Sequence, residues 1–447
     1  MLKASPRILR ISPPRILVMG FAMIITIGAF LLSLPIAHTN QQSFPLVDAF
    51  FTAASATCVT GLIVVDTGTH FSVFGQIVIL TLIQVGGLGF MTMATLVALM
   101  LRKKISLRER LILQEAMNQN SMEGIVRLIR RVVIYSILIE ACGATLFTLR
   151  WSFEMPFGQA LYFGVFHGVS FFNNAGFDLI GEFRSMTPFA EDFIINVTAM
   201  GLIILGGLGF IVISELAEYS NKRRLSLHSK VVLSMTGILI IVGAVVIFIF
   251  EFSNARTLGP LSWPGKILAA FFQSVSPRTA GVNTIDVGAM RQATQFFIII
   301  LMFIGASPGS TGGGIKTTTF MTLLGAMIAM VRGKEDVVVF RYRLAQQRVY
   351  KAITLTLLAL FLVVLVSMVL STTEDHQFLM ILFEVTSAFA TVGLTMGLTP
   401  DLTDFGKVVI MGMMFIGRLG PLTFAYALGP RNEKELYRHP EGNILIG

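Results

Sequence analysis

A pattern of phenylalanine, serine and glycine occurs four times in this chain at nearly constant spacing. The four copies are Phe51, Ser55 and Gly61; Phe166, Ser170 and Gly176; Phe272, Ser276 and Gly281; and Phe383, Ser387 and Gly393. The serine always follows the phenylalanine by four positions, about one turn of an α-helix. A long period of this kind in an apolar chain predicts four copies of one structural unit, each of which buries its polar loop against its neighbours.

The composition places these units in a membrane. Of the 447 residues, 54% are hydrophobic and only 13% are charged, whereas a soluble protein carries about 25% charged residues. Five segments hold 25 of the 34 Lys and Arg residues: 1–15, 102–131, 222–230, 332–351 and 431–447. They would share one side of the membrane, so the positive-inside rule predicts that both termini are cytoplasmic. The net charge of +9 therefore indicates topology and contact with membrane lipids, and no nucleic-acid partner is expected.

Each unit is predicted to contain an outer helix, a short pore helix, a filter loop and an inner helix. The expected outer helices are about 16–37, 126–150, 228–252 and 350–371, and the short helices about 46–56, 158–172, 264–275 and 377–389. The expected inner helices are about 72–101, 191–218 and 405–427, with the third broken into 292–305 and 318–331. The resulting fold class is an all-α polytopic membrane protein with four repeated units in a pseudo-fourfold arrangement. Unit one is 1–101, a cytoplasmic link is 102–125, units two to four are 126–221, 222–333 and 334–429, and a cytoplasmic tail is 430–447.

The loop after each short helix is the candidate ion-binding element. The first loop, around Val59-Thr60-Gly61, resembles a filter strand of potassium channels, in which backbone carbonyls replace the water of a cation. The candidate filter residues are Val59, Thr60, Gly61, Asn174, Ala175, Gly176, Thr279, Ala280, Gly281, Thr391, Val392 and Gly393. Potassium would bind through backbone carbonyls at the four glycines. The alternative is that these glycines only cap the short helices, but four matching positions favour the filter.

Glycines also recur in the inner helices and interrupt the third one. Gly86, Gly206, Gly305 and Gly417 follow the filter glycines by 24 to 30 residues and indicate close helix packing. The interruption comprises Gly305, Ala306, Ser307, Pro308, Gly309, Ser310, Thr311, Gly312, Gly313, Gly314, Ile315, Lys316 and Thr317. It lacks the Gly-Lys-Ser/Thr order of a phosphate-binding loop. Irregular backbone at membrane depth must be buried or line a wet cavity, so a gate beneath the filter is favoured over a passive kink.

Four further polar residues lie in apolar surroundings. Arg418 is a candidate pore barrier, or alternatively pairs with an acid or carbonyls of a neighbouring helix. Glu140 is either an ion or proton site or, as we favour, a group that makes a structural hydrogen bond or a lipid-side contact. His167 and Glu384 follow the repeated phenylalanines, and scaffold hydrogen bonds are favoured over metal ligation because the histidines show no ligand spacing.

The combination of Thr57-Cys-Val-Thr-Gly61, Ser276-Pro-Arg-Thr-Ala-Gly281, the broken third inner helix and Arg418 resembles the Trk/Ktr/HKT potassium-transporter superfamily. Over its whole length the chain looks most like the KtrB-type membrane subunit of a bacterial Ktr uptake system. This resemblance implies a non-enzymatic subunit for potassium uptake in the bacterial plasma membrane, often sodium-dependent, with potassium as its ion, sodium as a second candidate ion and no organic cofactor. It also implies a homodimer of pores and a cytosolic ring of RCK-type nucleotide-binding subunits. The segment 305–317 would then be the gate, and Arg418 would narrow the pore.

Three alternatives remain open from the residues alone. An alternating-access cation symporter would be favoured by inverted repeats, whereas these units repeat in parallel. A membrane enzyme would need a convergent catalytic group, and the sequence offers none. A sodium-permeable channel would use the same loops, because the number and field strength of the carbonyls decide between the two ions.

Overall fold

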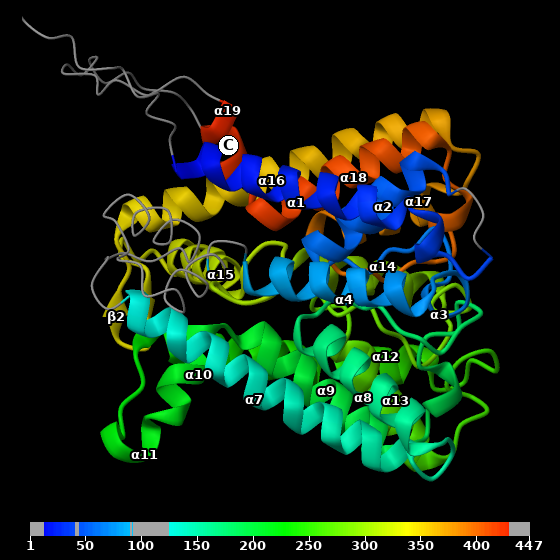
Figure 1. The fold of residues 1–447 in the computed structure, drawn as a ribbon. Coiled ribbons are helices and arrows are strands. Elements are labelled where there is room, and N and C mark those ends of the chain that lie inside the picture. Colours follow the sequence, from blue (N-terminus) through cyan, green and yellow to red (C-terminus); the bar gives the residue numbers. More distant parts are fainter. Residues whose placement is uncertain (1–12, 41–43, 90–91, 93–124, 429–447) are drawn as a thin grey trace, which may run out of the picture.

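The computed structural model describes residues 13–40, 44–89, 92 and 125–428, and α-helices make up most of that part of the chain (Figure 1). Among the described residues, four helices are long and apolar enough to cross a membrane, or up to six if each of two bent helix pairs is one span. The four are α1 (Pro13–Leu32), α7 (Ile125–Trp151), α12 (Leu227–Glu251) and α16 (Gln346–Thr373). They are the outer helices predicted from the hydrophobic runs, with most ends displaced by a few residues.

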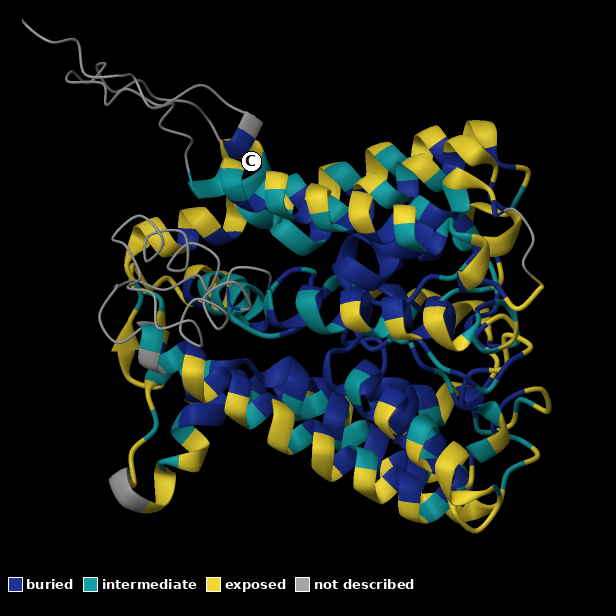
Figure 2. Cartoon of the chain, viewed as in Figure 1, coloured by how far each residue is buried: buried dark blue, intermediate teal, exposed yellow. Residues whose placement is uncertain are grey.

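Each outer helix packs against the short helix that follows it in the chain. The short helices are α2 (Leu46–Cys58), α8 (Phe157–Phe172), α13 (Trp263–Val275) and α17 (Phe378–Ala390). The repeated phenylalanines lie on these helices and are all fully or almost fully buried: Phe51, Phe166, Phe272 and Phe383. Apolar side chains such as Phe30 and Phe361 instead point outward from the outer helices. Figure 2 shows the buried residues along the middle of the bundle and the exposed ones around it, as expected when the outer faces contact lipid.

The inner helices begin with side-chain caps and run back through the bundle. They are α4 (Val73–Leu88), α9 (Phe193–Leu208), α14 (Gln292–Phe303) and α18 (Asp404–Leu419). Ser72, Asp192 and Thr403 accept hydrogen bonds from the backbone N–H groups three residues further on, which satisfies the otherwise free first turn. In unit three the carboxylate of Glu251, at the end of the outer helix, accepts the N–H of Arg291 at 2.9 Å instead.

The expectation of continuous inner helices in units one, two and four is wrong. Helix α4 ends at Leu88, α9 and α10 (Phe210–Ala217) meet at 104°, and α18 and α19 (Pro421–Leu428) meet at 98°. The residue at each break is a glycine with a left-handed φ, namely Gly89 (+82°), Gly209 (+91°) and Gly420 (+85°). Glycine adopts this conformation at little cost, and hydropathy does not reveal the bend because both sides of it are apolar.

The third inner helix is broken as predicted, since α14 ends at Phe303 and α15 (Thr317–Val331) begins beyond the glycine-rich segment. The structure adds an unpredicted two-stranded antiparallel hairpin, β1 (Val338–Val339) with β2 (Tyr342–Arg343). Short helices α3 (Thr67–His70) and α11 (Tyr219–Lys222) and the 3₁₀ turns Pro35–Ala37, Thr187–Phe189 and Thr399–Asp401 complete the described elements. The predicted helix beyond position 92, most of the link 102–125 and the tail 430–447 lie outside the described residues.

Candidate functional site

The four glycine loops meet edge to edge. A Cβ atom built on Gly61 would lie 2.4 Å from the carbonyl oxygen of Ala175, one on Gly176 2.6 Å from that of Ala280, one on Gly281 2.2 Å from that of Val392, and one on Gly393 2.1 Å from that of Thr60. Loop one thus contacts loop two, loop two contacts loop three, loop three contacts loop four, and loop four contacts loop one. The loops therefore form a closed ring, and a hydrogen is the only substituent that fits at these four positions.

The backbone conformation also repeats around this ring. Each glycine has a left-handed φ, between +69° and +93°, and so does the residue two positions before it, at Val59, Asn174, Thr279 and Thr391. The residue between them is not left-handed in any loop. The four loops therefore share one backbone conformation.

The repeated serines fasten each loop to its short helix. The backbone N–H of the residue before each glycine donates to the carbonyl of the serine at 2.8 to 2.9 Å: Thr60 to Ser55, Ala175 to Ser170, Ala280 to Ser276 and Val392 to Ser387. The hydroxyls of Ser55 and Ser387 also accept the glycine N–H groups, at 3.1 and 3.0 Å. Those of Ser170 and Ser276 donate to the carbonyls just after the glycines, at Phe177 and Val282. The serine recurs because each copy holds its loop in place.

The polar residues that follow the phenylalanines hold the chain where it leaves the ring. The N–H of Leu179 donates to His167 Nε2 at 3.3 Å, and the hydroxyl of Thr395 donates to Glu384 at 2.8 Å. These bonds confirm the scaffold role expected for His167 and Glu384. Within the described residues, no three His, Cys, Asp or Glu side chains are grouped so as to hold a metal ion.

Glu140 makes structural hydrogen bonds, as the sequence favoured. Its carboxyl group is buried on α7 and accepts from Gln84 Nε2 of α4 at 3.1 and 3.2 Å. It also accepts from Asn173 Nδ2, just before the second filter segment, at 3.1 Å. The group thus connects two helices of different units to one loop of the ring.

Three of the four recurring glycines approach the short helices closely, as predicted, whereas Gly305 lies against Gly313 within its own glycine-rich segment. A Cβ atom on Gly86, Gly206 or Gly417 would lie 1.8 to 1.9 Å from a backbone carbonyl oxygen near the end of a short helix. The three carbonyls belong to Thr57, Phe172 and Phe389. These glycines bring the inner helices against the base of the ring.

The glycine-rich segment 305–317, called here the intramembrane loop, packs directly against the ring. The N–H of Gly313 donates to the hydroxyl of Thr391 at 2.9 Å, and a Cβ atom on Gly312 would lie 2.0 Å from the hydroxyl oxygen of Thr279. Toward unit two, the N–H of Ser307 donates to the carbonyl of Gly207 at 3.0 Å. The loop thus touches units two, three and four.

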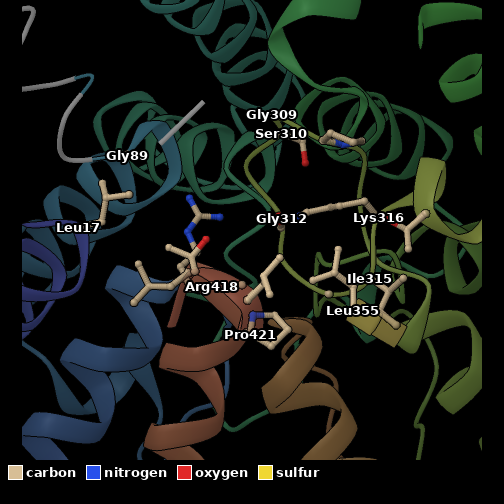
Figure 3. Close-up of a pocket in the computed structure, with 18 of the residues that line it drawn as sticks. Leu17, Gly89, Gly309, Ser310, Gly312, Ile315, Lys316, Leu355, Arg418 and Pro421 are labelled. Atoms are coloured by element: carbon tan, nitrogen blue, oxygen red, sulfur yellow. Dashed lines mark hydrogen bonds between the residues drawn. The ribbon is translucent and has the colours of Figure 1, made fainter. Parts of the chain in front are cut away.

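Two cationic side chains hold this loop. Lys316 Nζ donates to the carbonyls of Gly312 and Gly313 at 2.6 and 3.1 Å. The guanidinium of Arg418 donates to the carbonyls of Thr311, Gly86 and Gly87, the last at 2.9 Å. In Figure 3 the two side chains lie on either side of Gly312. Arg418 therefore has carbonyl partners, one of the two expected arrangements, and it also lines a cavity of about 290 Å³ with Lys316.

Sequence reasoning missed one ion pair between two units. Lys407 Nζ of α18 lies 2.6 Å from Asp48 Oδ1 of α2, and both side chains are largely buried. The residues are 359 positions apart. The only signal for this pair was the alignment of the repeats, in which Lys407 occupies a position held by an amide in the other units.

A bundle of apolar helices that holds four backbone loops in a ring defines a multi-pass membrane protein of the cation-transport class. The model of the TrkH family, described as a cation transport protein, matches residues 15–431. The chain belongs to this family. It is 45% identical to Ktr system potassium uptake protein B of Bacillus subtilis (strain 168), over 98% of this chain and 97% of that protein.

Two further relatives extend the comparison. The chain is 41% identical to the potassium/sodium uptake protein NtpJ of Enterococcus hirae, over 98% of both chains. The crystal structure of the potassium transporter TrkH from Vibrio parahaemolyticus superimposes with a TM-score of 0.72, covering 92% of this chain and 85% of that one. At 18% identity, that likeness supports the fold alone.

Proposed function

We propose that this chain is the potassium-selective, channel-like ion-translocating subunit of a bacterial potassium uptake system. The four units would surround one axis in a pseudo-fourfold arrangement, with the twelve filter residues forming the selectivity filter. The observation that carries this proposal is the closed ring of glycine contacts from Gly61 through Gly176 and Gly281 to Gly393. Ion passage through such a ring requires no covalent chemistry, so the chain is not an enzyme.

Selectivity would come from carbonyl oxygens that replace the water shell of the ion. The repeated left-handed backbone orients these carbonyls, and the serine hydrogen bonds keep them in place. The short helices end at the ring, so the negative ends of their dipoles face a cation there. A rigid carbonyl ring in a site shielded from water favours the ion whose hydration it reproduces.

The intramembrane loop would act as the gate and Arg418 as the pore barrier. The loop lies against Thr279 and Thr391 of the ring, where it would block an ion that leaves the filter. Lys316 and Arg418 add positive charge and hold the loop through three hydrogen bonds to its carbonyls, and Arg418 also donates to the carbonyls of Gly86 and Gly87 in unit one. Opening would require these bonds to break, which a regulatory subunit at the cytoplasmic face could drive.

The relatives and the charge distribution support a proposed assembly. The Bacillus subtilis relative is named as protein B of a Ktr system, and this name supports a partner component. We propose that the partner is a cytosolic RCK-type nucleotide-binding ring bound to a homodimer of pores. The basic segments support cytoplasmic termini. A sodium-permeable or sodium-dependent pathway is the second candidate, because the Enterococcus hirae relative is named a potassium/sodium uptake protein.

The test is ion flux through the purified chain in lipid vesicles, with potassium and sodium gradients imposed separately. We expect potassium flux driven by the membrane potential, with a much smaller sodium flux. Growth of potassium-uptake-deficient cells at low potassium provides a second readout. Equal flux of both ions would favour the sodium-permeable pathway, and flux of neither, with or without a regulatory ring, would contradict the proposal.

A further inference from the structure

The second loop of the ring differs from the others in its side chains. Its filter segment begins with asparagine, whereas the other three begin with valine or threonine. The Asn174 side-chain amide contacts the hydroxyl of Thr311, in the intramembrane loop, at 2.9 Å, and both residues are completely buried. Asn174 therefore connects the filter of unit two to the proposed gate of unit three.

Every polar atom of Thr311 has a partner. Its N–H donates to the carbonyl of Gly206 at 3.3 Å, and its hydroxyl donates to the same carbonyl at 3.1 Å. Its own carbonyl accepts from Arg418. If the amide oxygen and nitrogen of Asn174 are exchanged, the 2.9 Å contact remains with Thr311 as donor, and Ile203 and Gly207 of α9 become further partners of the amide. Thr311 is thus fixed by units two and four at once.

The backbone at Asn174 gives this contact a consequence for the filter. Its φ is +59°, a left-handed conformation that asparagine tolerates better than most residues but that still costs free energy. The side-chain bond to Thr311 helps to hold the residue there. If the loop moves away, that bond is lost, and the carbonyls next to Ala175 and Gly176 lose a constraint.

We propose that Asn174 is a positioning residue that couples the filter to the intramembrane loop, so that discrimination between potassium and sodium depends on where the loop lies. This inference rests on the proposed function and adds to it a specificity-determining role for one side chain. A bond that only stabilised the fold would change how much protein is active. Coupling instead changes the ratio of the two ion fluxes, because that ratio depends on how the carbonyls are held.

The experiment compares potassium and sodium fluxes of variants in vesicles of one lipid composition. Asn174→Ala and Thr311→Val remove the bond from its two ends, whereas Thr311→Ser keeps the hydroxyl. Thr148→Val is the matched control, because it removes a buried threonine hydroxyl that donates to the carbonyl of Ala144 in its own helix α7, away from the loop and the filter. Size-exclusion profiles and melting temperatures show whether each variant is folded.

We expect the potassium-to-sodium flux ratio to fall about fivefold in Asn174→Ala and in Thr311→Val, which is the effect of one hydrogen bond worth ~1 kcal/mol. The double variant should fall no further than either single one, because both remove the same bond. Thr311→Ser should keep the wild-type ratio. Thr148→Val should leave the ratio unchanged.

An unchanged ratio in both Asn174→Ala and Thr311→Val would overturn the coupling, and so would effects that add in the double variant. If Asn174→Ala does not fold, Thr311→Val against Thr311→Ser decides the question. Failure of the proposed function has a different signature, since the wild-type chain would then carry no potassium-selective flux. The wild-type measurement in the same vesicles therefore separates the two outcomes.

Discussion

Replacing Gly393 by alanine tests the ring most directly, because alanine adds one atom at its tightest contact. The new Cβ would lie 2.1 Å from the carbonyl oxygen of Thr60 and 3.0 Å from Gly61 Cα. Carbon and oxygen atoms that are not bonded stay about 3.3 Å apart. The Thr60 carbonyl must therefore retreat by about 1 Å, and it belongs to the filter segment of unit one.

The substitution also has a backbone cost that needs its own control. Gly393 has a φ of +93°, where a side chain costs about 1–2 kcal/mol. Gly397, in the same loop, has a φ of +95°, but a Cβ atom there would meet nothing within 4 Å. Gly397→Ala therefore carries the same backbone strain without the contact, and the difference between the two variants isolates the effect on the ring.

The assay is uptake of potassium and sodium, measured separately, in potassium-uptake-deficient cells with matched expression. We expect Gly393→Ala to lower the preference for potassium over sodium by about tenfold, which corresponds to ~1.4 kcal/mol of lost discrimination. Gly397→Ala should keep a preference within about twofold of the wild type, since surface changes away from special contacts cost little. If the two variants behave alike, the ring of glycines does not select the ion and the reasoning fails.

Three other predictions concern the proposed gate, a link between units and a carboxyl just after the second filter segment. Deleting part of 309–314 should raise potassium flux in vesicles, and an unchanged flux would leave only a passive kink. Lys407→Gln leaves the largely buried Asp48 without its partner at 2.6 Å and should lower the free energy of unfolding by about 1–3 kcal/mol, seen as a lower melting temperature in detergent. Arg184→Gln, in an exposed pair, is the control and should change the free energy of unfolding by less than about 1 kcal/mol. Equal effects of the two substitutions would contradict the prediction. Burial raises the pKa of the Asp178 carboxyl, which lies two residues after the filter glycine Gly176, to about 7. The group is negative only above that value, and a negative charge next to the ring would attract cations, so uptake at low potassium should fall as the pH is lowered from about 8 to about 6 in the wild type and not in Asp178→Asn.

The short helices and the outer helices could be predicted because their signals are local. The second short helix was expected at 158–172 and is Phe157–Phe172, and the third was expected at 264–275 and is Trp263–Val275. Proline or serine precedes both, and both end in a loop that leads to a glycine with a left-handed φ. The lengths of the apolar runs then predicted the outer helices. Such signals depend on neighbours in the chain and not on distant contacts.

The bend in the second inner helix could not be predicted because distant residues stabilise it. At the bend of unit two, the N–H of Phe210 is released from the helix and donates to the carbonyl of Gly309 at 2.9 Å. A Cβ atom on Gly209 would lie 2.6 Å from the carbonyl oxygen of Pro308. The N–H group that the bend releases in unit two and a backbone carbonyl of the intramembrane loop in unit three therefore form a hydrogen bond with each other. The glycines in the sequence permitted a bend, but only the loop explains why the chain adopts it.

The residue four positions after the N-cap of each inner helix shows how the units differ. At this position Gln76, Asn196 and Gln295 each donate to backbone carbonyls of their own unit, just before the inner helix. Unit four carries Lys407 there, which instead reaches Asp48. A lysine can pair with an acid in another unit, whereas the amides tie down local carbonyls.

Unit four differs because the four units form a closed ring, whereas the backbone that connects them is not closed. Units one and two, two and three, and three and four are joined by the backbone, but units four and one meet only through contacts such as those of α18 with α2. The ion pair of Lys407 with Asp48 lies at that junction and holds it without a covalent link. Arg418 acts in the same way, since it reaches from unit four to Gly86 and Gly87 of unit one. Lys407 and Arg418, which depart from the repeat, thus lie where unit four must contact unit one without a backbone connection, a requirement that the other three units do not have.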